Sequence, residues 1–519
     1  MSAAPRRAYD CIVVGGGHNG LTCAAYLARG RRSVLVLEAG AQVGGAAVTR
    51  EFAPGFRVSA CAHLLHAPAA VLRELALSAH GLKLAPGALT TLALAPDGAH
   101  LPLAAPGDWP GGAGRDAQAH EAYQARLARL AAALRPLLDV APPRLANSSW
   151  AERAALGGLA LRLRALGRRD LRELLRIGGM CVQDLLDEHF ESPLVKGALA
   201  FDAVLGTNYG PRSPGTVFTL LYRLAAGGGA GLAQPLGGLG ALSDALAGAA
   251  RAAGAEIRTT AAVQRILVRE DRAVGVVLES GEELAAGAVI SSADPKTTFL
   301  RLLGTEHLDT GFVRRIVNLR SRGLAAKVHL ALDGLPQFTG VAPAALAGRL
   351  LVAPSPEYLE RAFNHAKYCE CSAAPMLEIT MPTLADPALA PPGGQVLSVI
   401  AQYAPYDLAG GWEAGRQRFT DLVIDTLERF APGLRARVRG AQLLAPPDIE
   451  REFRISGGHW HHAELALDQF FMLRPVPGAA AYRAPVGGLF LCGAGCHPGG
   501  GVLGLAGRNA ARQVLKEAA

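Results

Sequence analysis

The 519-residue chain has no long hydrophobic run. Half of its residues are hydrophobic and its mean hydropathy is positive, at +0.21. Even so, no uninterrupted apolar stretch reaches the roughly 18 residues that a membrane-spanning helix requires. High alanine and glycine contents explain part of this hydropathy. The remainder predicts a large apolar pocket or a membrane-facing surface.

Patterns that indicate nucleic-acid binding or secretion are also missing. The net charge of +8 is mild, and there is no basic tail, RNA-binding motif or zinc-finger spacing, so we expect no nucleic-acid partner. The eight cysteines are scattered, and the pairs Cys369–Cys371 and Cys492–Cys496 lack the C-x-x-C spacing of redox thiols. No secretory segment precedes the first predicted strand. These absences predict a cytoplasmic, intracellular protein, with peripheral membrane contact as a further option.

The most informative feature that is present is a glycine-rich turn near the start of the chain. A predicted strand over 10–14 precedes it, and a predicted helix over 21–29 and a strand over 33–37 follow it. Gly15, Gly17 and Gly20 fit the G-x-G-x-x-G pattern, in which glycines allow a tight turn, close approach to a pyrophosphate and close packing of helix on strand. The phosphates would lie at the helix N-terminus, where free N–H groups favour negative charge. This unit predicts a dinucleotide site.

Two further features indicate which dinucleotide binds. Glu38 ends the second strand, where a carboxylate accepts hydrogen bonds from ribose hydroxyls and repels a 2′-phosphate, which argues against NADP. A second glycine turn lies near the other end of the chain, between a buried-strand pattern at 488–495 and a predicted helix over 502–516. Two glycine turns that each open a helix are what a flavoprotein needs to hold both ends of FAD.

Several motifs together resemble the phytoene desaturase-like FAD oxidoreductases, the branch of the flavin amine oxidase superfamily that includes carotenoid desaturases and isomerases. The matching motifs extend over nearly the whole chain: Val14–Gly20, Gly44–Thr49 with Pro54–Phe56, Ser213–Thr216, Leu467–Gln469 with Arg474–Pro475, and Cys492–Gly501. The resemblance and the glycine pattern together imply FAD as the cofactor. The residues expected to hold it are Gly15, Gly17, His18, Asn19, Gly20, Glu38, Ala39, Gly44, Gly45, Ala46, Val263, Gly493, Gly495, Gly500, Gly501 and Val502.

One residue departs from the pattern of the resembling enzymes. Carotenoid desaturases usually carry a basic residue directly after the glycine pair, and Ala46 stands there in this chain. Substrate identity is therefore not copied from the carotenoid enzymes.

The fold class implied by the resemblance is α/β. We expect an FAD-binding Rossmann-type (GR2-like) domain, discontinuous in sequence, with an inserted mixed α+β substrate domain. The FAD-binding parts are predicted at 1–80, 236–300 and 479–519, and the substrate-domain parts at 81–235 and 301–478. In the second substrate part, strands are predicted at 325–331, 375–380 and 395–402.

The candidate catalytic residues are histidines and a tyrosine in predicted loops. The resemblance places His497 beside the flavin ring and brings His63 and His66 near it, although capping or core packing is an equally good interpretation of the last two. Tyr403 and His459 are further candidates. His459, His461 and His462 together raise the question of a metal, but their spacing puts them on opposite strand faces or in a loop, so no metal site is predicted.

A strongly basic stretch over 153–176 supports two interpretations. Six arginines interleave there with eight leucines: Arg162, Arg164, Arg168, Arg169, Arg172 and Arg176, with Leu156, Leu159, Leu161, Leu163, Leu166, Leu171, Leu174 and Leu175. A cationic amphipathic helix of this kind can lie at a membrane interface and reach lipid-dissolved substrates. The alternative is a solvated helix face on a soluble domain.

The function predicted is an FAD-dependent oxidoreductase that dehydrogenates or isomerises a hydrophobic small molecule by hydride transfer to flavin N5. An amine oxidase is one alternative, and an aromatic content of 6% argues mildly against the aromatic cage that it would need. A flavin-binding regulatory or assembly protein is another. The sequence leaves the oligomeric state open, a homo-oligomer included.

Overall fold

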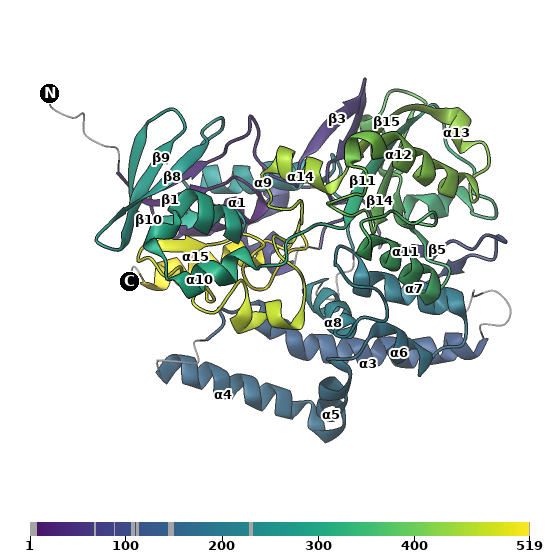
Figure 1. Cartoon of the computed structure of the whole chain (residues 1–519), viewed down its shortest axis with the longest axis horizontal. Helices are drawn as coiled ribbons and strands as arrows, with labels where there is room; N and C mark the ends of the chain where they lie inside the picture. Colours follow the sequence, from purple (N-terminus) through teal and green to yellow (C-terminus); the bar gives the residue numbers. More distant parts are fainter. Residues whose placement is uncertain are drawn as a thin grey trace.

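The computed structural model describes residues 8–66, 69–87, 89–104, 109, 114–143, 150–227 and 232–517. Within these residues the chain builds two large mixed sheets that lie side by side, with a layer of helices along one edge (Figure 1). Strands and helices alternate in the first sheet as in a doubly wound fold, and the second sheet is mainly antiparallel. The predicted α/β class with a Rossmann-type unit is confirmed.

The first sheet brings together the start, the middle and the end of the chain. Its order is β7-β2-β1-β10-β9-β8, and β16 pairs with β10. The strands are β1 (Ala8–Val14), β2 (Val34–Leu37), β7 (Glu256–Arg258), β8 (Val263–Arg269), β9 (Arg272–Leu278), β10 (Glu283–Ser291) and β16 (Leu489–Leu491). Pairing is parallel from β7 through β10 and β16, and antiparallel in the hairpin β8–β9 and between β9 and β10. Residues 11–14 of β1 and all four residues of β2 are apolar and buried, as expected of parallel strands that are covered on both faces.

The first and last long helices of the chain pack against each other over this sheet. They are α1 (His18–Arg29) and α15 (Leu505–Glu517). A Cβ added at Gly507 would lie 2.1 Å from the carbonyl oxygen of Asn19, so the two backbones approach as closely as only glycine allows. The predicted helix over 502–516 begins three residues later than expected. Val502 (φ +58°) and Gly504 (φ +69°) adopt left-handed conformations that an α-helix cannot include.

The second sheet has the order β15-β11-β14-β13-β12-β5-β6. Its strands are β5 (Thr91–Ala93), β6 (Leu101–Pro102), β11 (Ala325–Leu332), β12 (Arg349–Val352), β13 (Met376–Thr380), β14 (Gln395–Gln402) and β15 (Val438–Leu444). The strands predicted at 325–331, 375–380 and 395–402 are thus confirmed within one residue at each end. The helix α12 (Trp412–Glu428) packs on one face through Phe419, Val423 and Leu427.

The helical layer lies along the lower edge of the molecule and shares an apolar core with one face of the second sheet (Figure 1). It consists of α3 (Gly114–Leu138), α4 (Trp150–Ala165), α5 (Gly167–Ile177), α6 (Val182–Asp187), α7 (Pro193–Val204) and α8 (Thr216–Gly227). The remaining elements are α2 (Ala69–Glu74), α9 (Leu239–Ala252), α10 (Thr310–Val317), α11 (Pro356–Lys367), α13 (Leu434–Arg437), α14 (Pro446–Phe453), the hairpin β3 (Thr49–Ala53) and β4 (Phe56–Ser59), a π-helix at Thr297–Leu303, and short 3₁₀ turns.

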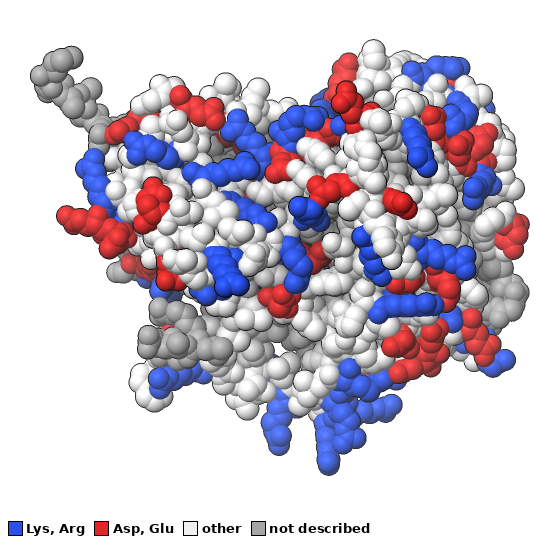
Figure 2. Space-filling model, in the orientation of Figure 1, with Lys and Arg blue, Asp and Glu red and all other residues white. Residues whose placement is uncertain are grey.

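The basic stretch over 153–176 is not the single helix that we expected. The helical run breaks at Leu166, between α4 and α5, and Gly167, the first residue of α5, has φ +82°, a left-handed conformation that interrupts an α-helix. Figure 1 shows both helices along the lower edge of the molecule, and Figure 2 shows lysine and arginine side chains projecting there. No helix among the described residues has the length and apolarity to cross a bilayer.

Candidate functional site

The N-terminal glycine turn leaves an open space at the start of α1. Gly17 is the N-cap of the helix, and no side chain caps it. A Cβ at Gly17 would meet only the Ser292 hydroxyl, at 4.0 Å, whereas a Cβ at Gly20 would lie 2.1 Å from the Gly15 carbonyl oxygen. Gly20 therefore closes the turn, and Gly17 keeps the space in front of the free helical N–H groups clear. This is the division of roles that the G-x-G-x-x-G spacing predicts.

Glu38 lies directly beside this turn. Its carboxylate accepts hydrogen bonds from the Gly16 N–H (2.7 Å) and the Gly40 N–H (2.7 Å), and Ala39 lies between the acid and Gly40. The chain that leads into β8, with Val263 as its first residue, runs alongside, since the Ala261 N–H donates to the Glu38 carbonyl oxygen (2.9 Å). Glu38 and Val263, both expected to hold FAD, thus belong to neighbouring segments.

The glycine pair after Glu38 lies against the first turn. The Gly44 N–H donates to the Gly16 carbonyl oxygen (2.8 Å), and a Cβ at Gly45 would be 3.3 Å from the Gly17 Cα. Ala46, the next residue, lines a cavity that begins at this point. The glycine pair therefore lies between the first glycine turn and the cavity.

The C-terminal glycines divide into two groups. Gly493 and Gly495 permit close packing on the segment after β10, because a Cβ would lie 2.4 Å from the Ser292 carbonyl oxygen and 2.5 Å from the Pro295 ring respectively. Gly500, Gly501 and Val502 instead line the same cavity as His18 and Ala46. The two glycine turns, almost 500 residues apart in sequence, thus border one space.

The residues around this space fit FAD. The Nε2 atom of His18 is buried at the turn and has no hydrogen-bond partner in the part of the chain that the structure describes. Burial lowers the pKa of His18 to about 4, so the imidazole is neutral. A clear cradle at Gly17, an uncapped helix and a buried polar atom without a partner together suit the phosphates and polar atoms of a dinucleotide.

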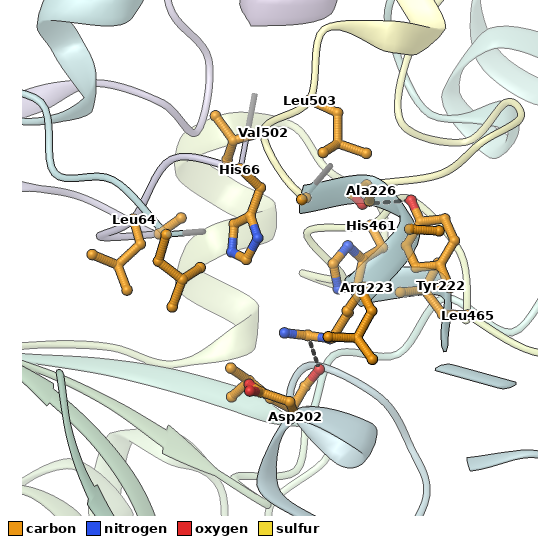
Figure 3. Close-up of a pocket in the computed structure, with 18 of the residues that line it drawn as sticks. Leu64, His66, Asp202, Tyr222, Arg223, Ala226, His461, Leu465, Val502 and Leu503 are labelled. Atoms are coloured by element: carbon orange, nitrogen blue, oxygen red, sulfur yellow. Dashed lines mark hydrogen bonds between the residues drawn. The ribbon is translucent and has the colours of Figure 1, made fainter. Parts of the chain in front are cut away.

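The cavity has a volume of about 570 Å³ and is largely apolar (Figure 3). From the glycine turns it extends between α3, α8 and the segment around residue 64. Its apolar wall includes Leu64, Ala131, Leu220, Leu465 and Leu503. Asp202, Arg223, Arg349, Glu378, His63 and His66 also line it.

A buried ion-pair network lies behind the charged part of the wall. The Arg349 guanidinium, at the start of β12, donates to both oxygens of Asp202 (2.6 and 3.1 Å) and to Glu378 Oε2 (2.5 Å). The other oxygen of Glu378 lies 2.9 Å from His63 Nε2. Burial by itself would raise the pKa of Glu378, but Arg349 and His63 outweigh it and hold the pKa well below the usual glutamate range. Glu378 is therefore an anion.

Comparison with known proteins identifies the family. The family described as flavin-containing amine oxidoreductase matches residues 20–515. The chain belongs to this family. The mouse (Mus musculus) pyridine nucleotide-disulfide oxidoreductase domain-containing protein 2 is 39% identical, over 98% of this chain and 94% of its own length. A neurosporene-forming phytoene desaturase from Cereibacter sphaeroides is 28% identical, over 53% of this chain and 52% of its own.

A solved structure has the same fold. A putrescine oxidase triple mutant from a redesign of cofactor binding superposes with a TM-score of 0.66, at 16% identity over 99% of both chains. The predicted cofactor and reaction class are confirmed: this flavin-containing amine oxidoreductase is an FAD-dependent oxidoreductase, related to phytoene desaturases.

The four predicted catalytic residues lie in different surroundings in this flavin-containing amine oxidoreductase. His63 lines the cavity. His497 Nε2 lies 2.8 Å from the Leu137 carbonyl oxygen, and the Tyr403 hydroxyl donates to the Tyr209 carbonyl oxygen (2.8 Å) inside the helical layer. His459 is buried, with Nε2 3.7 Å from Glu464 Oε2. Of the four, only His63 lines the cavity, whereas His497, although it lies in the C-terminal glycine turn, does not.

The histidines around 460 lie close together, and one of them borders the cavity. His461 presses on Gly500, where an added Cβ would lie 2.3 Å from His461 Nδ1, and it lines the cavity. Burial lowers the pKa of His461 well below its ordinary value. Among the described residues, no three His, Cys, Asp or Glu side chains are arranged to hold a metal ion.

Sequence reasoning missed the charged residues of the cavity, although a signal was present. Arg349 and Glu378 are single charges in the buried strand sequences RLLV and MLEIT, and Arg223 is the single charge in the α8 sequence TVFTLLYRLAAG. Charged residues in fully buried elements are rare unless they are paired or functional. Their partners could not be named, because they come from elements far apart in sequence.

The network ends in a lysine whose charge depends on pH. Lys327 on β11 is fully buried, with Nζ 2.5 Å from His63 Nδ1. Burial lowers its pKa to about 7, against the opposing effect of Glu378. Between this value and the ordinary lysine range the unfolded chain binds a proton that the folded chain lacks, so this lysine makes stability rise with pH, by up to about 1.4 kcal/mol per pH unit.

We therefore expect Lys327→Met to remove that dependence. Urea unfolding of the wild type and the variant between about pH 7 and pH 9 should show the wild type gaining stability relative to Lys327→Met as the pH rises. A difference between the two proteins that stays constant over this range would show that Lys327 titrates normally.

Proposed function

We propose that this FAD-dependent oxidoreductase dehydrogenates or isomerises a hydrophobic small molecule. The observation that carries the proposal is the apolar wall of the cavity, which begins at the two glycine turns and continues between α3 and α8. Burial of an apolar chain in such a space is favourable by about 25 cal/mol for each Å² removed from water. The relation to phytoene desaturases supports the same substrate class.

Different residues of the chain would bind the cofactor and the substrate in this reaction. Gly17, His18 and Glu38 would hold the dinucleotide end of FAD, and residues 500–502 would lie along its ring end. When bound, FAD accepts a hydride from a substrate C–H bond. The apolar wall excludes water and orients the substrate chain. His63 and His66 are weak bases, since burial lowers the pKa of each to about 4, which suits a reaction that needs no strong base.

The purified protein should be yellow and carry FAD, and anaerobic addition of a suitable apolar polyene should bleach the flavin absorbance. Mass spectrometry of co-purifying lipids would supply the candidates. Ala128 lines the cavity from α3, so Ala128→Trp should slow bleaching without loss of FAD. Ala125→Trp, exposed on the same helix and outside the cavity wall, is the matched control. Bleaching by simple amines with release of peroxide, and none by apolar donors, would favour the amine oxidase alternative.

We also propose peripheral membrane contact through α4 and α5. Large apolar side chains are exposed among the arginines there: Trp150 (83% exposed), Leu161 (69%) and Leu175 (76%). Exposed apolar groups beside cationic groups suit an anionic lipid surface. Sedimentation with vesicles that contain phosphatidylserine should bring down the wild type, and Trp150→Ser with Leu161→Ser and Leu175→Ser should reduce binding severalfold. Equal sedimentation of the two proteins would contradict this contact.

The predicted domain boundaries and location stay proposals. Segments 1–80, 236–300 and 479–519 contribute the strands of the first sheet, which supports their assignment to the FAD-binding domain. The second sheet is drawn from 81–235 and 301–478, the proposed substrate domain. All eight cysteines are free thiols, which supports an intracellular location.

A further inference from the structure

The charged part of the cavity holds two carboxylates that are already paired and one guanidinium with N–H groups that lack acceptors. Both oxygens of Asp202 accept from Arg349, and the two oxygens of Glu378 face Arg349 and His63. Three of these four carboxylate oxygens therefore already accept from Arg349, and the fourth lies 2.9 Å from His63 Nε2. A ligand that brings further N–H groups, such as an ammonium, would have to compete for them.

Arg223 on α8 carries that guanidinium. One of its terminal nitrogens donates to the Leu205 carbonyl oxygen (2.5 Å), and its Nε is buried without a hydrogen-bond partner. Among the described residues no carboxylate forms an ion pair with Arg223, and Asp202 pairs with Arg349 instead. A guanidinium carries five N–H donors, so most of those on Arg223 have no acceptor.

The surroundings of Arg223 show where an acceptor would come from. Figure 3 shows its side chain in the cavity, between His461 and Asp202, with Leu64, Val502 and Leu503 on the facing wall. His66 points into the same space, and its ring has no hydrogen-bond partner in the described part of the chain. A buried guanidinium N–H without an acceptor is costly, and a ligand that supplies an acceptor there removes that cost.

We propose that the cavity binds an amphiphile, with an apolar chain along the apolar wall and an anionic end group, carboxylate or phosphate, paired with Arg223. The proposal rests on the function proposed above and narrows its substrate class. A pure hydrocarbon would leave the Arg223 donors without acceptors, and an amine would meet acceptors that are already in use. An anion satisfies the guanidinium through charge-assisted hydrogen bonds, which are the strong ones in proteins.

The test is calorimetric titration of the FAD-loaded protein with four probes that share one chain: dodecanoate, dodecyl phosphate, dodecanol and dodecylamine, each below its micelle concentration. Dodecanoate or dodecyl phosphate should bind roughly ten- to a hundredfold more tightly than dodecanol. Arg223→Gln should lose this advantage and bind dodecanol unchanged, and Arg223→Lys should keep part of it. The control Arg437→Gln, an exposed arginine paired with Asp333, should match the wild type.

Several results would overturn the proposal. These are equal affinity of the wild type for dodecanoate and dodecanol, an Arg223→Gln protein that keeps the preference, or dodecylamine as the tightest ligand. Loss of FAD from Arg223→Gln would also overturn it, because Arg223 would then serve the cofactor. Dodecanoate and dodecyl phosphate separate the two sources of the anion. Anaerobic bleaching of the flavin by apolar polyenes, measured in the same preparations, tests the proposed function independently. Anion binding through Arg223 together with no bleaching by any polyene would refute the proposed function and leave the anion site standing.

Discussion

A chain that carries Gly17→Ala should fold as well as the wild type and yet be purified with little or no FAD. Gly17 has φ −66° and ψ 166°, an ordinary extended conformation, and an added Cβ would touch only the Ser292 hydroxyl, at 4.0 Å. Alanine is therefore accepted by the fold. The methyl group would project into the space in front of α1, where the phosphates must approach the backbone. We expect a loss of FAD affinity of at least about a hundredfold.

Gly20→Ala should behave differently, although it belongs to the same motif. Its Cβ would lie 2.1 Å from the Gly15 carbonyl oxygen, so the turn itself must open, and the chain should be destabilised by more than about 3 kcal/mol. Gly158→Ala on α4, where a Cβ meets nothing within 4 Å, is the control and should gain about 0.5–1 kcal/mol with FAD unchanged. Flavin absorbance per mole and thermal unfolding measure both effects. Full FAD content in a folded Gly17→Ala protein would contradict the placement of the cofactor.

Arg349→Met should be among the most destabilising single changes in this chain. It removes the cation that neutralises Glu378, which is 4% exposed, and leaves a buried carboxylate facing only a neutral imidazole. Breaking a buried pair by removing one partner costs about 3–5 kcal/mol. The same substitution at Arg435, an exposed arginine that also pairs with two carboxylates, Asp421 and Asp425, should cost less than about 1 kcal/mol.

A second change and the pH distinguish an unpaired charge from lost packing. Arg349→Met combined with Glu378→Met should recover part of the stability, because no buried charge is then left without a partner. The pKa of Glu378 is held below its ordinary value, so its stabilising contribution is present above the ordinary glutamate range and is lost as the pH falls through the lowered pKa. The difference between wild type and Arg349→Met should therefore narrow in acid. Urea unfolding could instead show a difference between wild type and Arg349→Met that does not change with pH, and a double variant no more stable than Arg349→Met. That result would attribute the lost stability to packing and not to an unpaired charge.

The cofactor side of the site could be predicted from sequence because its information is local. Gly15, Gly17 and Gly20 are needed within one turn, Glu38 lies at a set distance along the chain, and the backbone itself makes the contacts. The strand at 395–402 was equally predictable, since five of its eight residues are apolar and the signal depends on the strand's own sequence. Both features depend on neighbouring residues and not on how the rest of the molecule is arranged.

The substrate side could not be predicted in the same way. His63, Asp202, Arg349 and Glu378 come from four separate elements, and which of them pair depends on the register of β12 against β13 and on where α7 crosses them. The prediction of a single helix over 153–176 was wrong for a simpler reason. The spacing of arginines and leucines is continuous across this stretch, but the left-handed conformation of Gly167 interrupts the helix.

By itself, therefore, the sequence determined that this protein holds a dinucleotide, because a phosphate-binding turn is built from neighbouring residues. The second glycine turn and the family resemblance identified that dinucleotide as FAD. Only the tertiary structure decided what surrounds the substrate. A buried charge is tolerated only where distant elements bring it a partner, and Arg223 stands out because both nearby carboxylates pair with Arg349.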